Sequence, residues 1–154
     1  MIITHESMMA LTADMPMKQI VINGEVYLER YFAHTLPAGT QVWYHRFLRN
    51  DSERHLHSHP WESDSTILLG LYAEESLSGG EKVKITFLPG MTNHIRKWTI
   101  HRIVQVAANT WTQMIVRPGR DEQWYFIDDN GDEQAMQTSL FEWHQDCKPR
   151  GSQS

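Results

Sequence analysis

Short apolar stretches recur along the chain, and polar turn residues separate them. Within several stretches apolar and polar side chains alternate with a period of two, which is typical of half-buried β-strands. The number and spacing of the stretches are typical of an all-β sandwich or barrel. We predict eight strands, at 19–22, 26–32, 42–48, 66–72, 82–88, 101–106, 111–116 and 123–127. Helical periodicity is weak, and the best helical candidates are residues 4–11 and 139–145.

The turns between these strands carry recognisable sequence signals. Asn23-Gly24 lies between the first two predicted strands and is a strong signal for a two-residue hairpin turn. Asn130-Gly131 marks another turn within the acidic segment 128–133. This segment looks superficially like a calcium loop, but an EF-hand places its glycine sixth, and here the glycine is fourth. An exposed hairpin turn is therefore the better interpretation of 128–133.

The composition indicates one globular domain. The chain has 154 residues, of which 40% are hydrophobic and 21% charged, and this length suffices for one domain with a buried core. The net charge of −5 argues against a general nucleic-acid binder, which would carry a basic surface. We expect three parts, an N-terminal extension (1–18), a barrel (19–146) and a flexible tail (147–154).

The sequence also indicates a cellular compartment. Cys147 is the one cysteine, which excludes an internal disulfide and favours a reducing compartment. No basic start followed by an apolar run is visible at the N-terminus, and no apolar stretch approaches the length of a membrane span. We therefore expect a cytoplasmic protein.

Metal-binding side chains are concentrated between His55 and Asp64. His57 and His59 are one residue apart, so on an extended strand both imidazoles point to the same side and can reach one ion. Glu62 and Asp64 follow at once. A carboxylate added to histidines is typical of open catalytic metal sites. The alternative interpretation is a histidine-rich surface turn.

Two motifs, one after the other along the chain, resemble the two sequence motifs of the cupin superfamily. His57-x-His59 is followed by an acid, and Gly70 closes the next predicted strand. Later, the Pro89-Gly90 turn precedes a strand with His101. More narrowly, the chain resembles small cupin-like proteins over roughly residues 26–143. The shared positions are Arg46-Phe47, His57 to Trp61, His101-Arg102-Ile103, Trp111-Thr112, Pro118-Gly119 and Trp124-Tyr125-Phe126.

The resemblance implies a fold and a ligand set. The fold is an all-β double-stranded β-helix, the cupin jelly-roll barrel, with short flanking helical segments. The implied metal ligands are His57, His59, Asp64 and His101. Glu62 is an alternative to Asp64, and a site with three histidines and no firmly bound carboxylate is also open. His94 is the main rival to His101.

A candidate for substrate binding lies on an earlier strand. Arg46 alternates with Tyr44 on its predicted strand, so the two share a face. In a barrel of inward histidines, an inward arginine would hold an anion. We therefore place Arg46 and Tyr44 in the catalytic site and expect His45 to face the other way. The alternative is a structural ion pair of Arg46 with Glu29, Asp64 or another acid.

The resemblance implies a metal-dependent cupin, with a mononuclear non-haem iron oxygenase of the dioxygenase type as the first hypothesis. Fe(II) is the favoured metal, and Zn, Mn and Ni also suit the ligands. The substrate would be a small molecule, and an anionic one if Arg46 faces the site. The alternatives are a metal-dependent isomerase, lyase or hydrolase, and a non-enzymatic cupin that binds a small ligand. We expect no nucleic-acid or membrane partner, and a homodimer is an assembly that the edge strands of a small barrel allow.

Overall fold

The computed structural model describes residues 2–22, 24–50, 55–119, 125–135 and 144–152. These residues form one α-helix, twelve strands and short 3-10 turns at Pro37–Gly39 and Arg150–Ser152. In chain order the longer elements are α1 (His5–Thr12), β1 (Met17–Ile22), β2 (Glu25–Thr35), β3 (Gln41–Phe47), β4 (Ser63–Leu69), β5 (Tyr72–Ser78), β6 (Glu81–Phe87), β7 (Thr92–Ile95), β8 (His101–Val106), β9 (Thr110–Val116), β10 (Tyr125–Ile127), β11 (Glu133–Ala135) and β12 (His144–Cys147).

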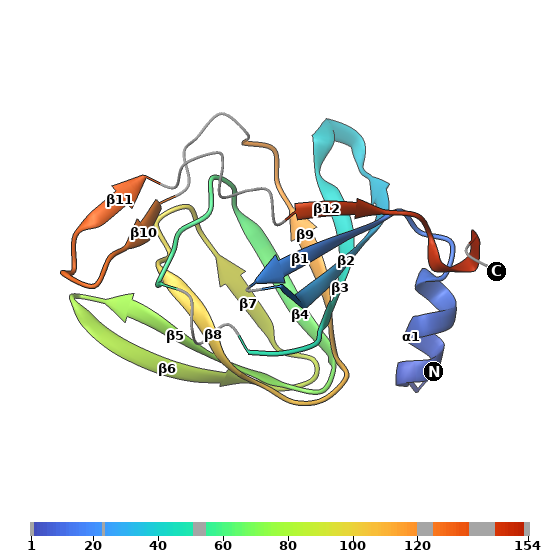
Figure 1. The fold of residues 1–154 in the computed structure, drawn as a ribbon, viewed down its shortest axis with the longest axis horizontal. Coiled ribbons are helices and arrows are strands. Elements are labelled where there is room, and N and C mark those ends of the chain that lie inside the picture. The colour runs from blue at the N-terminus through green and yellow to red at the C-terminus, as the bar shows by residue number, and fades with distance from the viewer. Residues whose placement is uncertain (1, 23, 51–54, 120–124, 136–143, 153–154) are drawn as a thin grey trace.

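The strands form two main antiparallel sheets and a small hairpin. The large sheet has the order β12-β1-β2-β3-β9-β4-β7, and the small sheet has the order β6-β5-β8. β10 and β11 pair with each other. Figure 1 shows β5, β6 and β8 on one side of the molecule and β1, β2, β3 and β9 on the other. The predicted all-β jelly-roll architecture is confirmed.

Apolar side chains from both main sheets form the core between them. The large sheet contributes Leu28, Phe47 and Ile67, and the small sheet contributes Tyr72 and Ile103. Full burial of one such side chain stabilises the fold by about 1.5–3 kcal/mol. Several of these core residues also line the cavity next to the histidines described below.

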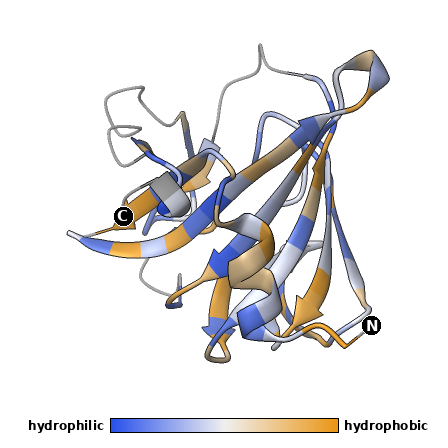
Figure 2. Cartoon of the chain, turned by 90° about the vertical axis from the view of Figure 1, so that its right-hand side faces the viewer, coloured by the Kyte–Doolittle hydropathy of each residue, from blue (hydrophilic) through white to orange (hydrophobic). Residues whose placement is uncertain are grey.

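The opposite face of the large sheet is covered by α1, which lies in front of the strands in Figure 2. The helix begins after Thr4, whose side chain and that of Ser7 form a capping box. Met8 packs with Tyr31 and Trp111 in a second buried cluster. Both faces of the central strands are therefore buried, one against the small sheet and one against the helix.

The C-terminal residues pack near the same helix. Arg150, within the predicted tail, donates hydrogen bonds to the Thr12 hydroxyl at 2.7 Å and to the Met9 carbonyl at 2.8 Å. Its guanidinium also lies 5.1 Å from the centre of the Tyr31 ring. Cys147 belongs to β12, which pairs with β1.

Several predicted elements differ from the observed ones. The predicted strand 66–72 is divided at Gly70, so that β4 ends at Leu69 and β5 begins at Tyr72. Gly70 has φ +79°, and an added Cβ would lie 2.8 Å from the Thr110 Cα, so only glycine fits this corner. The short strand β7 was not predicted. The helix predicted at 139–145 falls mostly outside the described residues, and its last two positions belong to β12.

The acidic segment 128–133 forms the predicted turn between β10 and β11. The Asp128 side chain accepts hydrogen bonds from the backbone N–H groups of Asn130 and Asp132, both at 2.9 Å. Within the described residues, no helix is long and apolar enough to cross a membrane.

Candidate metal centre

The two histidine motifs lie side by side in the structure. His57 is on the segment between β3 and β4, and His101 begins β8. Their backbones form an antiparallel bridge, in which His57 N donates to His101 O at 3.0 Å and His101 N donates to His57 O at 2.9 Å. This bridge holds the two side chains next to each other. His59 lies two residues further along the first segment, as period-two alternation requires for a shared side.

The imidazoles of His57, His59 and His101 converge on one point. Their ligand-capable nitrogens all lie within 4.8 Å of one another, and the ring centres are 4.9 to 5.2 Å apart. Two nitrogens that are each about 2.1 Å from one ion are separated by about 3.0–3.4 Å. His59 Nδ1 and His101 Nε2 are 3.3 Å apart. The cluster therefore fits a single transition-metal ion.

Hydrogen bonds determine which nitrogen of two rings is left for an ion. His57 Nδ1 lies 3.1 Å from the carbonyl oxygen of His55. His101 Nδ1 contacts the Glu74 carboxylate. A carbonyl and a carboxylate can only accept, so both Nδ1 atoms carry the proton and both Nε2 atoms keep a lone pair. Metal-bound histidines commonly donate their second N–H in this way.

Glu74 is a buried residue of the centre that sequence reasoning missed. It is 4% exposed, and the oxygen that contacts His101 also accepts a hydrogen bond from Asn93 Nδ2 at 2.9 Å. Asn93 Nδ2 lies 3.0 Å from the Tyr72 hydroxyl, and burial raises the pKa of Tyr72 to about 12. The available signal was alternation, because Tyr72 and Glu74 share one face of β5.

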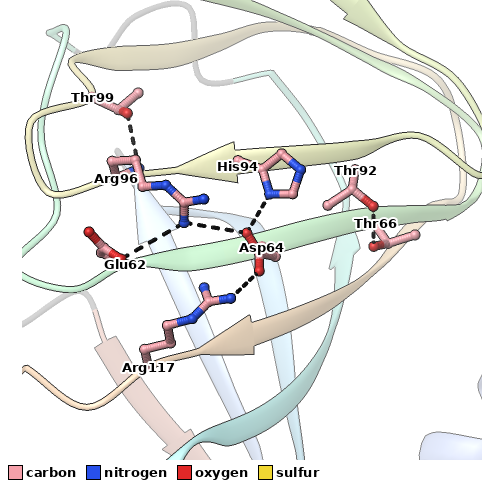
Figure 3. A network of polar contacts seen from close by, with 8 residues as sticks. All are labelled: Glu62, Asp64, Thr66, Thr92, His94, Arg96, Thr99 and Arg117. Atoms are coloured by element: carbon pink, nitrogen blue, oxygen red, sulfur yellow. Dashed lines mark hydrogen bonds and ion pairs between the residues drawn. The ribbon is translucent and has the colours of Figure 1, made fainter.

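Asp64, a predicted ligand, lies apart from the three histidines. Ser63 and Ser65 are each 1% exposed and line the interior, so alternation turns Asp64 to the outer face of β4. There it accepts hydrogen bonds from Arg117 at 2.6 Å and from His94 at 2.7 Å (Figure 3). Burial raises the pKa of Asp64, but these hydrogen bonds outweigh it and hold the pKa below its ordinary value.

The two alternative ligands also lie in this outer network. Glu62 Oε2 is 3.8 Å from Arg96 Nη1, and the same Arg96 nitrogen is 3.6 Å from Asp64 Oδ1 (Figure 3). His94 is on β7, directly across the sheet from Asp64. Neither Glu62 nor His94 belongs to the metal-binding cluster. The structure thus brings together the three-histidine alternative.

Arg46 and Tyr44 face away from the centre, which reverses the predicted faces of β3. Tyr44 packs against the cluster beneath α1, and Arg46 Nη1 lies 3.6 Å from Glu29 Oε1. Arg46 thus forms the structural ion pair with Glu29 that the sequence left open as the alternative. His45 and Phe47 instead face the interior. The placement of Arg46 and Tyr44 in the catalytic site is not supported.

A cavity of about 90 Å³ adjoins the three histidines. Apolar side chains such as Ile95 and Met114 form much of its wall, and Ser63 and Ser65 add hydroxyl groups. Arg30, from β2, lines it as well. A ligand group held entirely within this volume would be small. Sequence reasoning did not single out Arg30, although its alternation with the apolar residues Leu28 and Phe32 was a signal for an inward side chain.

The sequence matches no protein-family model and no curated protein. Solved structures with a similar fold were found. The Fe(II) form of HppE aligns with a TM-score of 0.53 and 12% identity over 67% of this chain and 56% of that one. Streptomyces albus HEPD, solved with 2-hydroxyethylphosphonate and Fe(II), aligns with a TM-score of 0.56 and 11% identity over 70% of this chain and 25% of that one.

A cupin-2 domain from Rhodospirillum rubrum aligns with a TM-score of 0.50 and 14% identity, over 73% of this chain and 68% of that one. The present chain spans about half the length of HppE and a quarter of that of HEPD. At these identities the likeness concerns the fold. Together with the two antiparallel sheets and the histidine-lined interior, it shows that this chain has the cupin-type jelly-roll fold.

Proposed function

We propose that this protein is a metal-dependent enzyme that holds one Fe(II) ion at His57, His59 and His101 and oxidises a small molecule with dioxygen. The observation that carries the proposal is the convergence of three histidine side chains, two of which have Nδ1 occupied by an acceptor. In the described part of the chain, no carboxylate belongs to the cluster. Three protein ligands leave coordination positions open, which is the pattern of catalytic rather than structural metal sites.

The protein's own residues have defined tasks in this proposal. His57, His59 and His101 hold the ion, and Glu74 keeps the proton on His101 Nδ1 so that Nε2 faces the ion. The apolar cavity wall positions the substrate and excludes water. A bound Fe(II) would supply the redox chemistry of dioxygen and a Lewis-acidic position for the substrate. Fe(II) is also the ion in the solved structures of HppE and HEPD.

A metal analysis with matched variants tests the centre. Protein loaded anaerobically with Fe(II) and desalted should contain about one equivalent by elemental analysis. His59→Ala should lose most of this metal, because one of three ligands is removed. His94→Ala is the matched control, since His94 bonds Asp64 on the outer face, and it should keep the full equivalent. A folded wild-type protein that takes up no metal would contradict the proposal, as would equal losses in both variants.

Oxygen consumption tests the reaction type. Loaded wild-type protein should consume dioxygen with at least one member of a panel of small organic acids, amino acids and phosphonates, and His59→Ala should not. A second candidate is a redox-independent lyase, isomerase or hydrolase with Zn, Mn or Ni. It is favoured by the fold likeness to DMSP lyases, at a TM-score of 0.50 and 13% identity over 66% of this chain and 53% of that one. Stoichiometric metal and substrate turnover without oxygen uptake would support this candidate instead.

A further inference from the structure

Arg30 is a cation of the cavity whose orientation is set by two neighbours. Its Nε donates a hydrogen bond to His45 Nε2 at 3.2 Å, and its guanidinium carbon lies 4.7 Å from the centre of the Trp43 ring. Arg30 and His45 are direct partners in the β2–β3 register. Because Nε is occupied by His45, the two terminal nitrogens are the donors that remain for a ligand.

Among the described residues, no carboxylate lies within ion-pair distance of Arg30. Five other arginines have one: Arg46 pairs with Glu29, Arg49 with Glu25, Arg96 with Glu62 and Asp64, Arg102 with Glu75, and Arg117 with Asp64. Arg30 is half-buried, and withdrawing a cation from water without a counter-ion is costly. Burial lowers the pKa of Arg30 to about 10, so the side chain is still cationic at neutral pH. Within the described residues, no carboxylate therefore balances the positive charge that Arg30 brings to the cavity.

His45 accepts a hydrogen bond from Arg30, and this arrangement is unfavourable for stability. Its Nε2 accepts from Arg30, so the proton is on Nδ1. Nδ1 is buried and has no hydrogen-bond partner among the described residues. Burial, and then the charge of Arg30, hold the pKa of His45 well below its ordinary value, so the ring stays a neutral acceptor. An unsatisfied buried donor costs about 1–3 kcal/mol, which argues that the pair is retained for a ligand.

A second hollow meets the metal cavity at Arg30. This outer recess is lined by Lys18, Gln41 and Arg117, and it shares Arg30, Trp61 and Val116 with the metal cavity. The residues lining it in the described part of the chain include three cations and no carboxylate. Lys18 and Arg117 already have the acidic partners Asp146 and Asp64. Of these three cations, Arg30 is the one with no acidic partner in the described part of the chain.

We propose that Arg30 binds an oxyanion group of the substrate, a carboxylate or a phosphoryl group, while the rest of the molecule extends toward the three histidines. Here His45 is a positioning residue that holds the guanidinium through Nε. The inference rests on the proposed function in that the ligand is the substrate of the metal centre. A guanidinium with two free terminal nitrogens suits the bidentate recognition of carboxylate and phosphate oxygens.

Titrations of small anions test this assignment. Wild-type protein loaded with redox-inert Zn(II) is titrated with propionate and with methylphosphonate, and binding is followed by protein NMR. Propionamide is the uncharged control. Arg30→Gln should weaken binding of the preferred anion by about 10-fold to 100-fold, because both charge-assisted hydrogen bonds are lost. Arg30→Lys should weaken it less, and the stronger wild-type ligand shows whether the oxyanion is a carboxylate or a phosphoryl group.

Matched variants distinguish anion binding by Arg30 from a general effect of charge or folding. Arg46→Lys changes an arginine of the neighbouring strand that faces away from the cavity, and it should leave anion affinity unchanged. His45→Leu should weaken anion binding without changing the metal content, and His45→Gln should restore it, since a glutamine oxygen can accept from Arg30 Nε.

Two results would overturn the assignment. One is wild-type anion affinity in Arg30→Gln, and the other is wild-type affinity in Arg30→Lys, which decides the question if the glutamine variant does not fold. In both cases the metal content of the variants shows whether the centre itself is intact. If the wild type takes up no metal, the proposed function fails, and the same titrations on metal-free protein still decide the role of Arg30.

Discussion

Replacing Glu74 should weaken metal binding at His101 without any change to the three histidines. One oxygen of Glu74 accepts from both His101 Nδ1 and Asn93 Nδ2. In Glu74→Gln the amide oxygen can keep both hydrogen bonds, so the main loss is the negative charge behind the imidazole. We expect metal affinity to fall about tenfold, the lower end of the range for partners of metal-bound histidines. The free energy of unfolding should change little.

Glu74→Leu removes the acceptor as well as the charge. His101 Nδ1–H and the Asn93 amide then lose a buried partner, and each unsatisfied donor costs about 1–3 kcal/mol. The free energy of unfolding of the metal-free protein should therefore fall by about 2–5 kcal/mol. Metal affinity should fall by about 100-fold, because His101 is free to change its tautomer and orientation.

A chelator competition titration measures the affinity, and urea unfolding of metal-free protein measures the stability. Glu75→Gln is the matched control. Glu75 is the next residue and bonds Arg102 at 2.9 Å on the opposite face of β5, so it should keep wild-type metal affinity and lose at most about 1 kcal/mol. The reasoning would be refuted if Glu74→Leu bound metal as tightly as the wild type.

Three further perturbations test other parts of the structure. Because the pKa of His45 is lowered in the folded protein, the unfolded state binds more protons below about pH 6.5, and the free energy of unfolding should fall by up to about 1.4 kcal/mol per pH unit between pH 6.5 and pH 5. Urea unfolding should show a smaller pH dependence for His45→Gln than for the wild type. An equal pH dependence would exclude His45 as its source. Asp64→Asn should lower the free energy of unfolding at pH 7 by about 1 kcal/mol and leave metal content by elemental analysis unchanged, whereas a large loss of metal would restore Asp64 as a ligand. Gly70→Ala should lower the free energy of unfolding by roughly 2–4 kcal/mol, because the new Cβ would clash with Thr110. A melting temperature equal to that of the wild type would show that the backbone at this corner relaxes.

The strands and the first pair of histidines follow from local sequence. Alternation and turn residues predicted most of the strands, because period two and turn chemistry are properties of a few consecutive residues. His57 and His59 share a side for the same local reason. The helix over 4–11 was predicted close to its observed bounds. That His101 belongs beside His57 was implied by a family resemblance, and the backbone bridge between the two residues shows how it comes about.

The side of β3 that faces the cavity could not be read from the sequence. Alternation separates Tyr44 and Arg46 from His45 and Phe47, but it does not say which set is inside. If one face of the large sheet were exposed to water, its polar side chains would have identified the outer face of β3. Here α1 covers the Tyr44 side and the small sheet covers the Phe47 side, so both faces carry large apolar side chains.

The sequence by itself therefore determined the all-β class, most of the strands and a histidine pair that can share an ion, because these depend on neighbours along the chain. Tertiary structure alone decided that Asp64 turns outward, that Glu74 supports His101 from 27 residues away, and that Arg30 rather than Arg46 faces the cavity. Each of these depends on which strands become neighbours and which faces they bury. Strand pairing and sheet packing are long-range, so no single stretch of sequence encodes them.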